Sequence, residues 1–195
     1  MSTTPDELTI QRHDGQGLRE QKDELLTVYQ EVYAERLSDP FFYPARFWER
    51  LERGSSRDGF RLVTGRVKDE LVGFTLGSVL PANSGWWRGF KGDVDPDLLR
   101  ETGTRTFGIN ELMVRPVWRR RGYAKALSNA LLEGLPVERV TLLVRAENTA
   151  AYTAYISWGF YTIGQMQPFD DSPLYEAMMR ELETGGHDPL ANSPR

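Results

Sequence analysis

The sequence contains no cysteine, which excludes disulfide bonds, thiolate metal sites and a cysteine nucleophile. Its two histidines, His13 and His187, lie far apart along the chain, so no metal site is expected. No run approaches the roughly 18 consecutive apolar residues of a membrane-spanning helix. The first residues also lack the basic and apolar segments of a secretory signal, so we expect a cytoplasmic protein without a membrane partner.

The sequence also lacks an excess of basic residues, because its net charge is −4. Nothing in the overall composition therefore indicates a nucleic acid partner. A local group of basic side chains stands out against this acidic background: Arg115, Arg119, Arg120, Arg121 and Lys125. A nucleic-acid-binding surface and a solvated basic face are both alternatives for this group, and the acidic net charge disfavours the first.

Hydrophobic periodicity and turn residues predict an α/β fold in the order β-α-α-β-β-β-α-β-α-β-β. With 39% hydrophobic residues the chain can bury one core, so residues 1–183 are expected to form a single domain. The mixed order favours one twisted, mixed sheet with helices on both faces. The tail, residues 184–195, is expected to be disordered. Strands are predicted at 8–12, 60–67, 70–80, 106–114, 139–144, 160–166 and 175–182, and helices at 18–33, 44–51, 123–133 and 149–158.

A long segment without predicted regular structure, residues 81–105, contains Trp86, Trp87 and Phe90. Loops of this length inside a compact domain are often functional. These side chains either form a lid over an apolar acceptor pocket or anchor the segment to the core, and the aromatic residues between 41 and 48 allow the same two interpretations. The acidic residues at 93, 95 and 97 do not form a calcium loop, because its glycine and its final glutamate are missing.

One segment carries the clearest chemical information. The predicted strand at 106–114 stops before Pro116 and leads through three arginines and Gly122 into a helix. The start of a helix leaves backbone N–H groups without partners, and these donors bind phosphate groups together with the helix dipole. Gly122 has no side chain to hinder such a ligand. The glycine patterns of a P-loop and of a dinucleotide-binding fold are absent, so this turn is the predicted phosphate site.

Two motifs in residues 106–166 resemble those of the Gcn5-related N-acetyltransferases, the GNAT superfamily. The first, Arg119-Arg-Arg-Gly122-Tyr-Ala124, matches the family pattern Gln/Arg-x-x-Gly-x-Gly/Ala and follows the strand end Leu112-Met-Val114-Arg-Pro116. The second places Asn148, Ala151, Tyr155 and Gly159-Phe160 at the spacing of the family. Both occur in the order that the family shows, and the resemblance therefore implies the GNAT fold.

The resemblance further implies that acetyl-CoA is the co-substrate. Backbone N–H groups around Gly122 would hold its pyrophosphate, and the strand ending at Val114 would separate from its neighbour at 139–144 so that pantetheine lies in the gap. A backbone N–H near Met113 would also stabilise the thioester oxyanion, by roughly 3 kcal/mol. Asn148 is in addition a predicted helix cap. The residues implied in cofactor binding are Met113, Val114, Arg119, Arg120, Arg121, Gly122, Tyr123, Ala124, Lys125, Asn148 and Tyr155.

The implied reaction transfers the acetyl group to a primary amine. An alkyl amine has a pKa of about 10.4, so about one molecule in 2,500 is neutral at pH 7, and deprotonation costs roughly 4.6 kcal/mol. The leaving thiol has a pKa of about 8.5 and needs only about 2 kcal/mol of help. A general base therefore matters more to this reaction than a general acid.

Two residues are the predicted catalytic groups. Glu111 is the predicted base, directly or through water, because it lies on the strand that meets the thioester. The alternative to this catalytic role is that Glu111 forms a salt bridge with an arginine or faces solvent. The neighbouring Asn110 is a second polar group that could bind substrate. Tyr155 is the predicted acid because it matches the family tyrosine, with simple packing as its alternative. Tyr152 shares its helix face, but the spacing to Gly159 selects Tyr155.

The sequence thus predicts an acetyl-CoA-dependent N-acetyltransferase in which a small-molecule or exposed peptide amine attacks the thioester directly. A non-catalytic module that binds acyl-CoA is the alternative. An antibiotic, a polyamine, an amino acid and a protein N-terminus all remain open as acceptors. The family resemblance also leaves a homodimer open.

Overall fold

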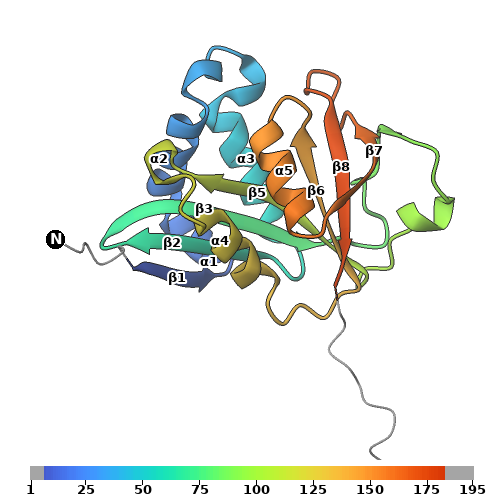
Figure 1. Ribbon diagram of the computed structural model, residues 1–195, viewed down its shortest axis with the longest axis horizontal. Coiled ribbons are helices and arrows are strands. Elements are labelled where there is room, and N and C mark those ends of the chain that lie inside the picture. Colours follow the sequence, from blue (N-terminus) through green and yellow to red (C-terminus); the bar gives the residue numbers. More distant parts are fainter. Residues whose placement is uncertain (1–6, 183–195) are drawn as a thin grey trace, which may run out of the picture.

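The computed structural model describes residues 7–182, where helices cover both faces of a single sheet (Figure 1). The strands are β1 (Leu8–His13), β2 (Arg61–Val67), β3 (Glu70–Val79), β4 (Phe90–Lys91), β5 (Thr106–Val114), β6 (Arg139–Arg145), β7 (Tyr161–Met166) and β8 (Tyr175–Glu181). The α-helices are α1 (Gly15–Glu20), α2 (Lys22–Val32), α3 (Pro44–Gly54), α4 (Tyr123–Leu132) and α5 (Thr149–Ser157). The predicted disorder of residues 184–195 concerns a segment outside the described residues.

The strands follow the order β1-β2-β3-β5-β6-β8-β7-β4 across the sheet. Neighbouring strands are antiparallel except β5 and β6, which are parallel. The mixed α/β fold predicted from the sequence is therefore confirmed, as is the antiparallel hairpin between β2 and β3. The single parallel junction lies in the middle, so two antiparallel halves of the sheet meet at β5 and β6.

The helices divide between the two faces of the sheet. On one face, α1, α2 and α3 bury Leu18, Leu25 and Phe47 in a cluster that includes Phe74 of β3. On the other face, α4 buries Leu127 in a cluster formed with β5 and β6, and α5 packs against the same cluster. Helices thus cover a buried cluster on each face of the sheet, and the junction of β5 and β6 lies between these two helix layers.

Two elements differ from the sequence prediction. The helix expected over residues 18–33 is two helices, because the chain turns at Gln21, which ends α1 and begins α2. The first begins at Gly15, since the Asp14 carboxylate accepts hydrogen bonds from the N–H groups of Gln16 and Gly17. The segment 81–105, expected to be irregular, contains β4, which extends the sheet by pairing with β7.

A buried ion pair fixes the end of this long segment to the base of β6. The Arg139 guanidinium lies 3.2 Å from Glu101 Oε1 and donates to Thr106 Oγ1 at 2.8 Å. Trp87 Nε1 donates to the same Glu101 oxygen at 2.8 Å. Both charged side chains are almost fully buried, with 3% and 2% of their surfaces exposed. Neither charge has access to water, so each depends on the other for compensation.

Replacing Arg139 with methionine should lower the free energy of unfolding by about 3–5 kcal/mol, because Glu101 would remain charged and buried without a partner. Urea unfolding followed by circular dichroism measures this. The double variant Glu101→Met/Arg139→Met serves as the control and should recover most of the loss, since it buries no charge. A single variant within about 1 kcal/mol of the native chain would contradict this role of the ion pair.

Candidate active site

Strands β5 and β6 separate before either of them ends. Their parallel pairing covers Thr106–Ile109 and Arg139–Leu142, while β5 continues to Val114 and β6 to Arg145. The predicted cofactor residues Met113 and Val114 lie in the diverging part of β5, where β3 is their partner on the other side. This part of β5 therefore has one edge that is not paired to β6, in the middle of the sheet.

A β-bulge at Asn110 decides which face of the sheet Glu111 occupies. Gly77 of β3 pairs with Ile109 and Leu76 pairs with Glu111, so Asn110 is an extra residue in β5. Ile109 therefore faces the α4 side, whereas Glu111 shares its face with Leu76 on the side of α2 and α3. Without the extra residue the alternation along the strand would turn Glu111 into the core beneath α4.

Glu111 is a partly buried carboxyl group that makes no hydrogen bond or ion pair through its side chain to any residue in the described range. Burial raises its pKa to about 7, and the nearby positive charge of Arg50 opposes this rise only in part. Burial raises the pKa of Tyr29 and Tyr33 most, and the charge of Glu111 raises both further, so these tyrosines lie within reach of its charge. A carboxyl group with a pKa close to neutrality is suited to accept a proton.

Tyr155 approaches the same space from α5. Burial raises its pKa most, followed by the charges of Tyr33 and Glu111. Its ring packs edge-on against Trp158 and Phe160, at centroid distances of 5.4 and 5.7 Å. Its hydroxyl has no hydrogen-bond partner within residues 7–182. The two predicted catalytic side chains thus come from opposite layers and interact electrostatically near the unpaired edge of β5.

Tyr152, the other tyrosine on this helix face, has a structural role. Its hydroxyl lies 3.0 Å from Thr162 Oγ1 of β7, a contact that attaches α5 to the sheet. This hydroxyl is therefore occupied, whereas that of Tyr155 is available for a substrate. The choice of Tyr155 over Tyr152 as the acid stays a prediction.

The turn before α4 has the backbone of an anion-binding loop. Arg120 and Gly122 adopt left-handed conformations, with φ of 60° and 81°. Gly122 is the N-cap of α4, and the helix start has neither a side-chain cap nor an acidic residue in its first turn. A Cβ built on Gly122 would meet nothing within 4 Å. The start of α4 thus has no side-chain cap and no acidic residue in its first turn, which is typical of a helix start that binds an anion.

The arginines near this turn differ in their contacts. Arg119 donates to the Val114 carbonyl at 3.2 Å, and the Arg121 guanidinium stacks 4.8 Å from the Trp118 ring. Arg115, grouped with them in the sequence, forms ion pairs with Glu31 and Glu70 and is not available to a ligand. The basic group is therefore smaller than the sequence indicates, and it consists of exposed side chains around the helix start.

Asn148 caps α5, as predicted, by accepting a hydrogen bond from the Ala151 N–H at 3.3 Å. Its side chain is bound in this way to the helix, and a cofactor contact stays a prediction. Across the described part of the chain no three metal-binding side chains come together, and no helix has the length and apolar character to span a bilayer.

The aromatic residues of segment 81–105 anchor it to the rest of the chain. Trp86 lies against Gly108 of β5, Trp87 bonds to Glu101, and Phe90 belongs to β4. In residues 41–48 the side chains of Phe41, Phe42, Phe47 and Trp48 are buried, and Tyr43 is exposed. Both groups thus contribute packing, and the second also borders the space around Glu111 through the ring of Phe47, which stacks on Tyr29 at 3.8 Å.

Sequence reasoning missed several polar groups around Glu111, namely Tyr29, Tyr33, Arg50, Arg145 and Tyr175. Tyr29 lies on α2, and Tyr33, four residues further on, is the C-cap of that helix. Their hydroxyl groups were the available signal, because buried tyrosines need polar partners. Arg145 and Tyr175 lie where β6 ends and β8 begins, and these strands pair with each other, which the sequence does not show.

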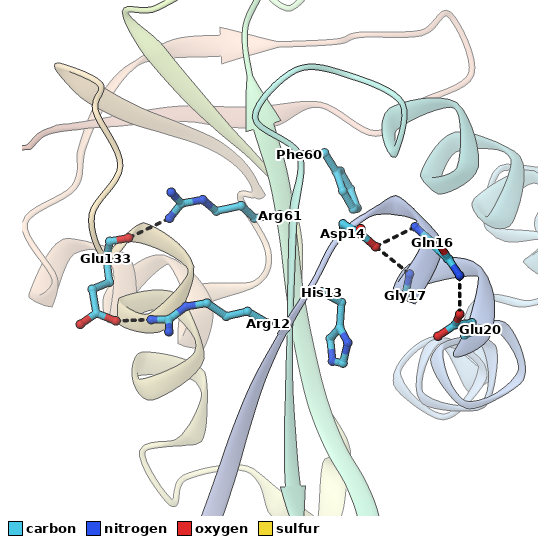
Figure 2. A pocket seen from close by; sticks show the side chains of 9 residues that line it. All are labelled: Arg12, His13, Asp14, Gln16, Gly17, Glu20, Phe60, Arg61 and Glu133. Atoms are coloured by element: carbon cyan, nitrogen blue, oxygen red, sulfur yellow. Dashed lines mark hydrogen bonds and ion pairs between the residues drawn. The ribbon is translucent and has the colours of Figure 1, made fainter.

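An open pocket at the β1 edge of the sheet is separate from this site (Figure 2). Strands β2 and β3 lie between it and β5. Its charged groups bind one another: Arg12 pairs with Glu133, Arg61 donates to the Glu133 carbonyl, and Gln16 bonds to Glu20 (Figure 2). These contacts attach the end of α4 to the edge of the sheet, which is a structural role.

Comparisons with known proteins bear on the family and the fold of this chain. The profile of the Acetyltransferase (GNAT) family matches residues 22–160. A search of curated protein sequences finds no match. The fold is similar to PH1933 from Pyrococcus horikoshii, with a TM-score of 0.64 and 19% identity over 90% of this chain and 99% of that chain.

Two further similar structures are described as acetyltransferases. PaiA N-acetyltransferase from Thermoplasma acidophilum, solved in complex with coenzyme A, has a TM-score of 0.56 and 12% identity over 90% of this chain and 99% of that one. Aminoglycoside 6′-acetyltransferase type Ii has a TM-score of 0.60 and 17% identity, with 89% and 96% covered. These identities show a shared fold, and the family match covers most of the chain: the protein belongs to the GNAT family of acetyltransferases.

Proposed function

We propose that this protein is an acetyl-CoA-dependent N-acetyltransferase that acetylates a primary amine. The observation that carries the proposal is the position of Glu111, whose pKa is raised to about 7, beside the unpaired edge of β5. Tyr155 interacts electrostatically with Glu111, and the start of α4 has no side-chain cap. In this proposal Glu111 is the base, Tyr155 is the acid and the start of α4 is the phosphate-binding turn.

The residues around the gap match the parts of acetyl-CoA. The N–H groups from Arg120 to Lys125 would hold the pyrophosphate, and the unpaired groups of β5 near Met113 and Val114 would bond to pantetheine. When bound, acetyl-CoA supplies a thioester whose acetyl group can be transferred. Coenzyme A in the similar PaiA structure supports this assignment.

Glu111 would accept a proton from the acceptor ammonium, directly or through water, so that the neutral nitrogen can attack the thioester carbon. A C–N bond forms, the C–S bond breaks, and Tyr155 donates its proton to the departing sulfur. The backbone of β5 would stabilise the negative charge on the thioester oxygen. The attacking nitrogen loses its second proton as the amide forms, which restores the Tyr155 hydroxyl, and the proton held by Glu111 leaves to solvent.

Release of free thiol from acetyl-CoA in the presence of a panel of primary amines tests this function, and calorimetry with acetyl-CoA tests binding separately. Binding together with amine-dependent thiol release is the expected result. Binding without thiol release would instead support a module that holds acyl-CoA without catalysis, and no heat with acetyl-CoA or coenzyme A would contradict both assignments.

Tyr155→Phe should lower kcat by about 10- to 30-fold at pH 7, because a thiol of pKa about 8.5 needs only about 2 kcal/mol of help in leaving. Its acetyl-CoA affinity should change little, since the ring and its packing remain. Steady-state kinetics and calorimetry measure the two effects. Tyr152→Phe is the matched control, because it removes a hydroxyl bound to Thr162 from the same helix. Equal kcat values for the Tyr155 variant and the native chain would remove Tyr155 as the acid.

A further inference from the structure

Two arginines, Arg50 and Arg145, each have a buried guanidinium nitrogen that makes no hydrogen bond within the described residues. Arg50 Nη1, on α3, is buried and has no hydrogen-bond partner in the described part of the chain, where Arg50 also forms no ion pair. Arg145 Nη1, at the end of β6, is buried too and makes no hydrogen bond. Its one carboxylate contact is Glu147 at 3.4 Å, whose side chain is 56% exposed and also contacts Arg36. A buried guanidinium that lacks a partner is unfavourable unless something else binds it.

Both arginines lie against one group of aromatic rings, because Arg50 lies over Phe41, Arg145 lies over Phe42, and these two rings contact each other. Both Arg50 and Arg145 lower the pKa of Tyr33 and of Tyr175, two residues whose pKa is raised on balance by burial. Arg145 lies 5.8 Å from the ring of Tyr33, and Arg50 lies 5.4 Å from the ring of Phe41. Arginines that come from α3 and β6 therefore approach the same aromatic surface from different layers.

The carboxylates of this region do not neutralise these arginines. Asp171 is bound by both guanidinium nitrogens of Arg46, at 2.5 and 2.9 Å. Glu111 has a pKa of about 7 and is therefore partly protonated at neutral pH. Aromatic stacking stabilises a cation, but it gives no acceptor for the N–H groups. Within residues 7–182, Arg50 thus has no ion-pair partner, and the carboxylate that contacts Arg145 is the exposed Glu147.

We propose that the acceptor amine carries a carboxylate, as an α-amino acid does, and that Arg50 and Arg145 bind this carboxylate while Glu111 faces the amine. The inference rests on the proposed acetyltransferase function and names its substrate class. Guanidinium groups match carboxylates in shape and charge, and such bonds are the strong ones in proteins. Arg50 is close enough to Glu111 to act on its charge, so amine and carboxylate must be near each other in the acceptor. The phosphates of coenzyme A have a separate place at the start of α4.

Paired acceptors test the proposal. Each standard amino acid is compared with its carboxamide, and phenylalanine also with phenethylamine, by thiol release from acetyl-CoA. At least one amino acid should exceed its carboxamide in kcat/KM by about 10- to 100-fold, the range of a charged hydrogen-bonded pair. Arg50→Met should reduce this ratio to near one, chiefly through KM. Arg50→Lys should retain part of the preference because it keeps the charge.

The matched control is Arg46→Met. Arg46 stacks on the same Phe41 ring, at 5.0 Å, but its charge is already paired with Asp171, so this variant should keep the preference for the carboxylate. If every carboxamide were acetylated with the same kcat/KM as its amino acid, this proposal would be overturned and the proposed function would stay intact. A preference that survives in Arg50→Met would also overturn it. Acetyl-CoA binding without thiol release for any amine would remove the proposed function and this inference with it.

Discussion

Glu111→Gln should lower the rate of acetyl transfer at pH 7 by about 100- to 10,000-fold, the range that a positioned general base contributes. Glutamine has nearly the same size as glutamate and cannot accept the proton of the ammonium. In the native protein the rate should rise with pH and level off above about 7, where the Glu111 carboxyl is ionised. In the variant the rate should continue to rise toward the much higher pKa of the amine itself. An unaltered pH profile would mean that another group is the base.

The stability of the Glu111→Gln variant shows whether a loss of activity comes from the missing base or from a damaged fold. The pKa of Glu111 is raised from its ordinary value of 4.5 to about 7, so the folded state binds this proton more tightly than the unfolded state does. The native chain should therefore lose stability as pH rises between these values, while the variant has no such loss. Urea unfolding at pH 8 should show the variant to be the more stable chain, and the difference should vanish near pH 4. A variant that is less stable at pH 8 would show that Glu111 is needed for folding instead.

Gly122→Trp should abolish measurable acetyl-CoA binding, with an affinity loss of more than about 100-fold, or roughly 2.7 kcal/mol. The indole would occupy the space in front of the first N–H groups of α4, which is open in the structure. Calorimetry with acetyl-CoA measures the effect. The left-handed conformation at Gly122, with φ of 81°, also makes any side chain strained there, by about 1–3 kcal/mol.

Gly134→Trp is the matched control for this strain. Gly134 follows the other end of α4, has φ of 64°, and likewise has open space where a Cβ would lie. The two variants should lose similar stability in urea unfolding, and only the first should lose affinity. Equal affinities in both variants would show that the start of α4 is not the phosphate site.

The parts of this fold that the sequence predicts are those encoded by short segments. The strand, the arginine-rich turn and α4 follow one another directly, so local patterns identify them and the family resemblance. The face that Glu111 occupies depends on the bulge at Asn110. Its signal was present, because the apolar positions shift from Phe107 and Ile109 to Leu112 and Val114, which breaks the alternation of a regular strand.

Other features depend on distant contacts that local patterns do not encode. Arg50 and Arg145 are almost a hundred positions apart along the chain, and each has an ordinary local context, a helix face and a strand end. Arg115 lay among ligand-binding candidates in the sequence, and its partners Glu31 and Glu70 are far away along the chain. Charge partners across the sheet are decided by topology, so the sequence predicts the reaction better than it predicts the acceptor.

The fork between β5 and β6 has a mechanical consequence. The two antiparallel halves of the sheet are joined by only four residue pairs, Thr106–Ile109 with Arg139–Leu142. Beyond these pairs the two strands separate, at the place where the reaction would occur. A ligand with amide groups that binds between β5 and β6 would form hydrogen bonds to both strands, as an additional strand does, and would link the two halves of the sheet. Since such a ligand binds the folded chain alone, its occupancy must raise resistance to unfolding. Under the proposed function, acetyl-CoA would therefore stabilise the fold while it is bound, and each release of product would remove that stabilisation.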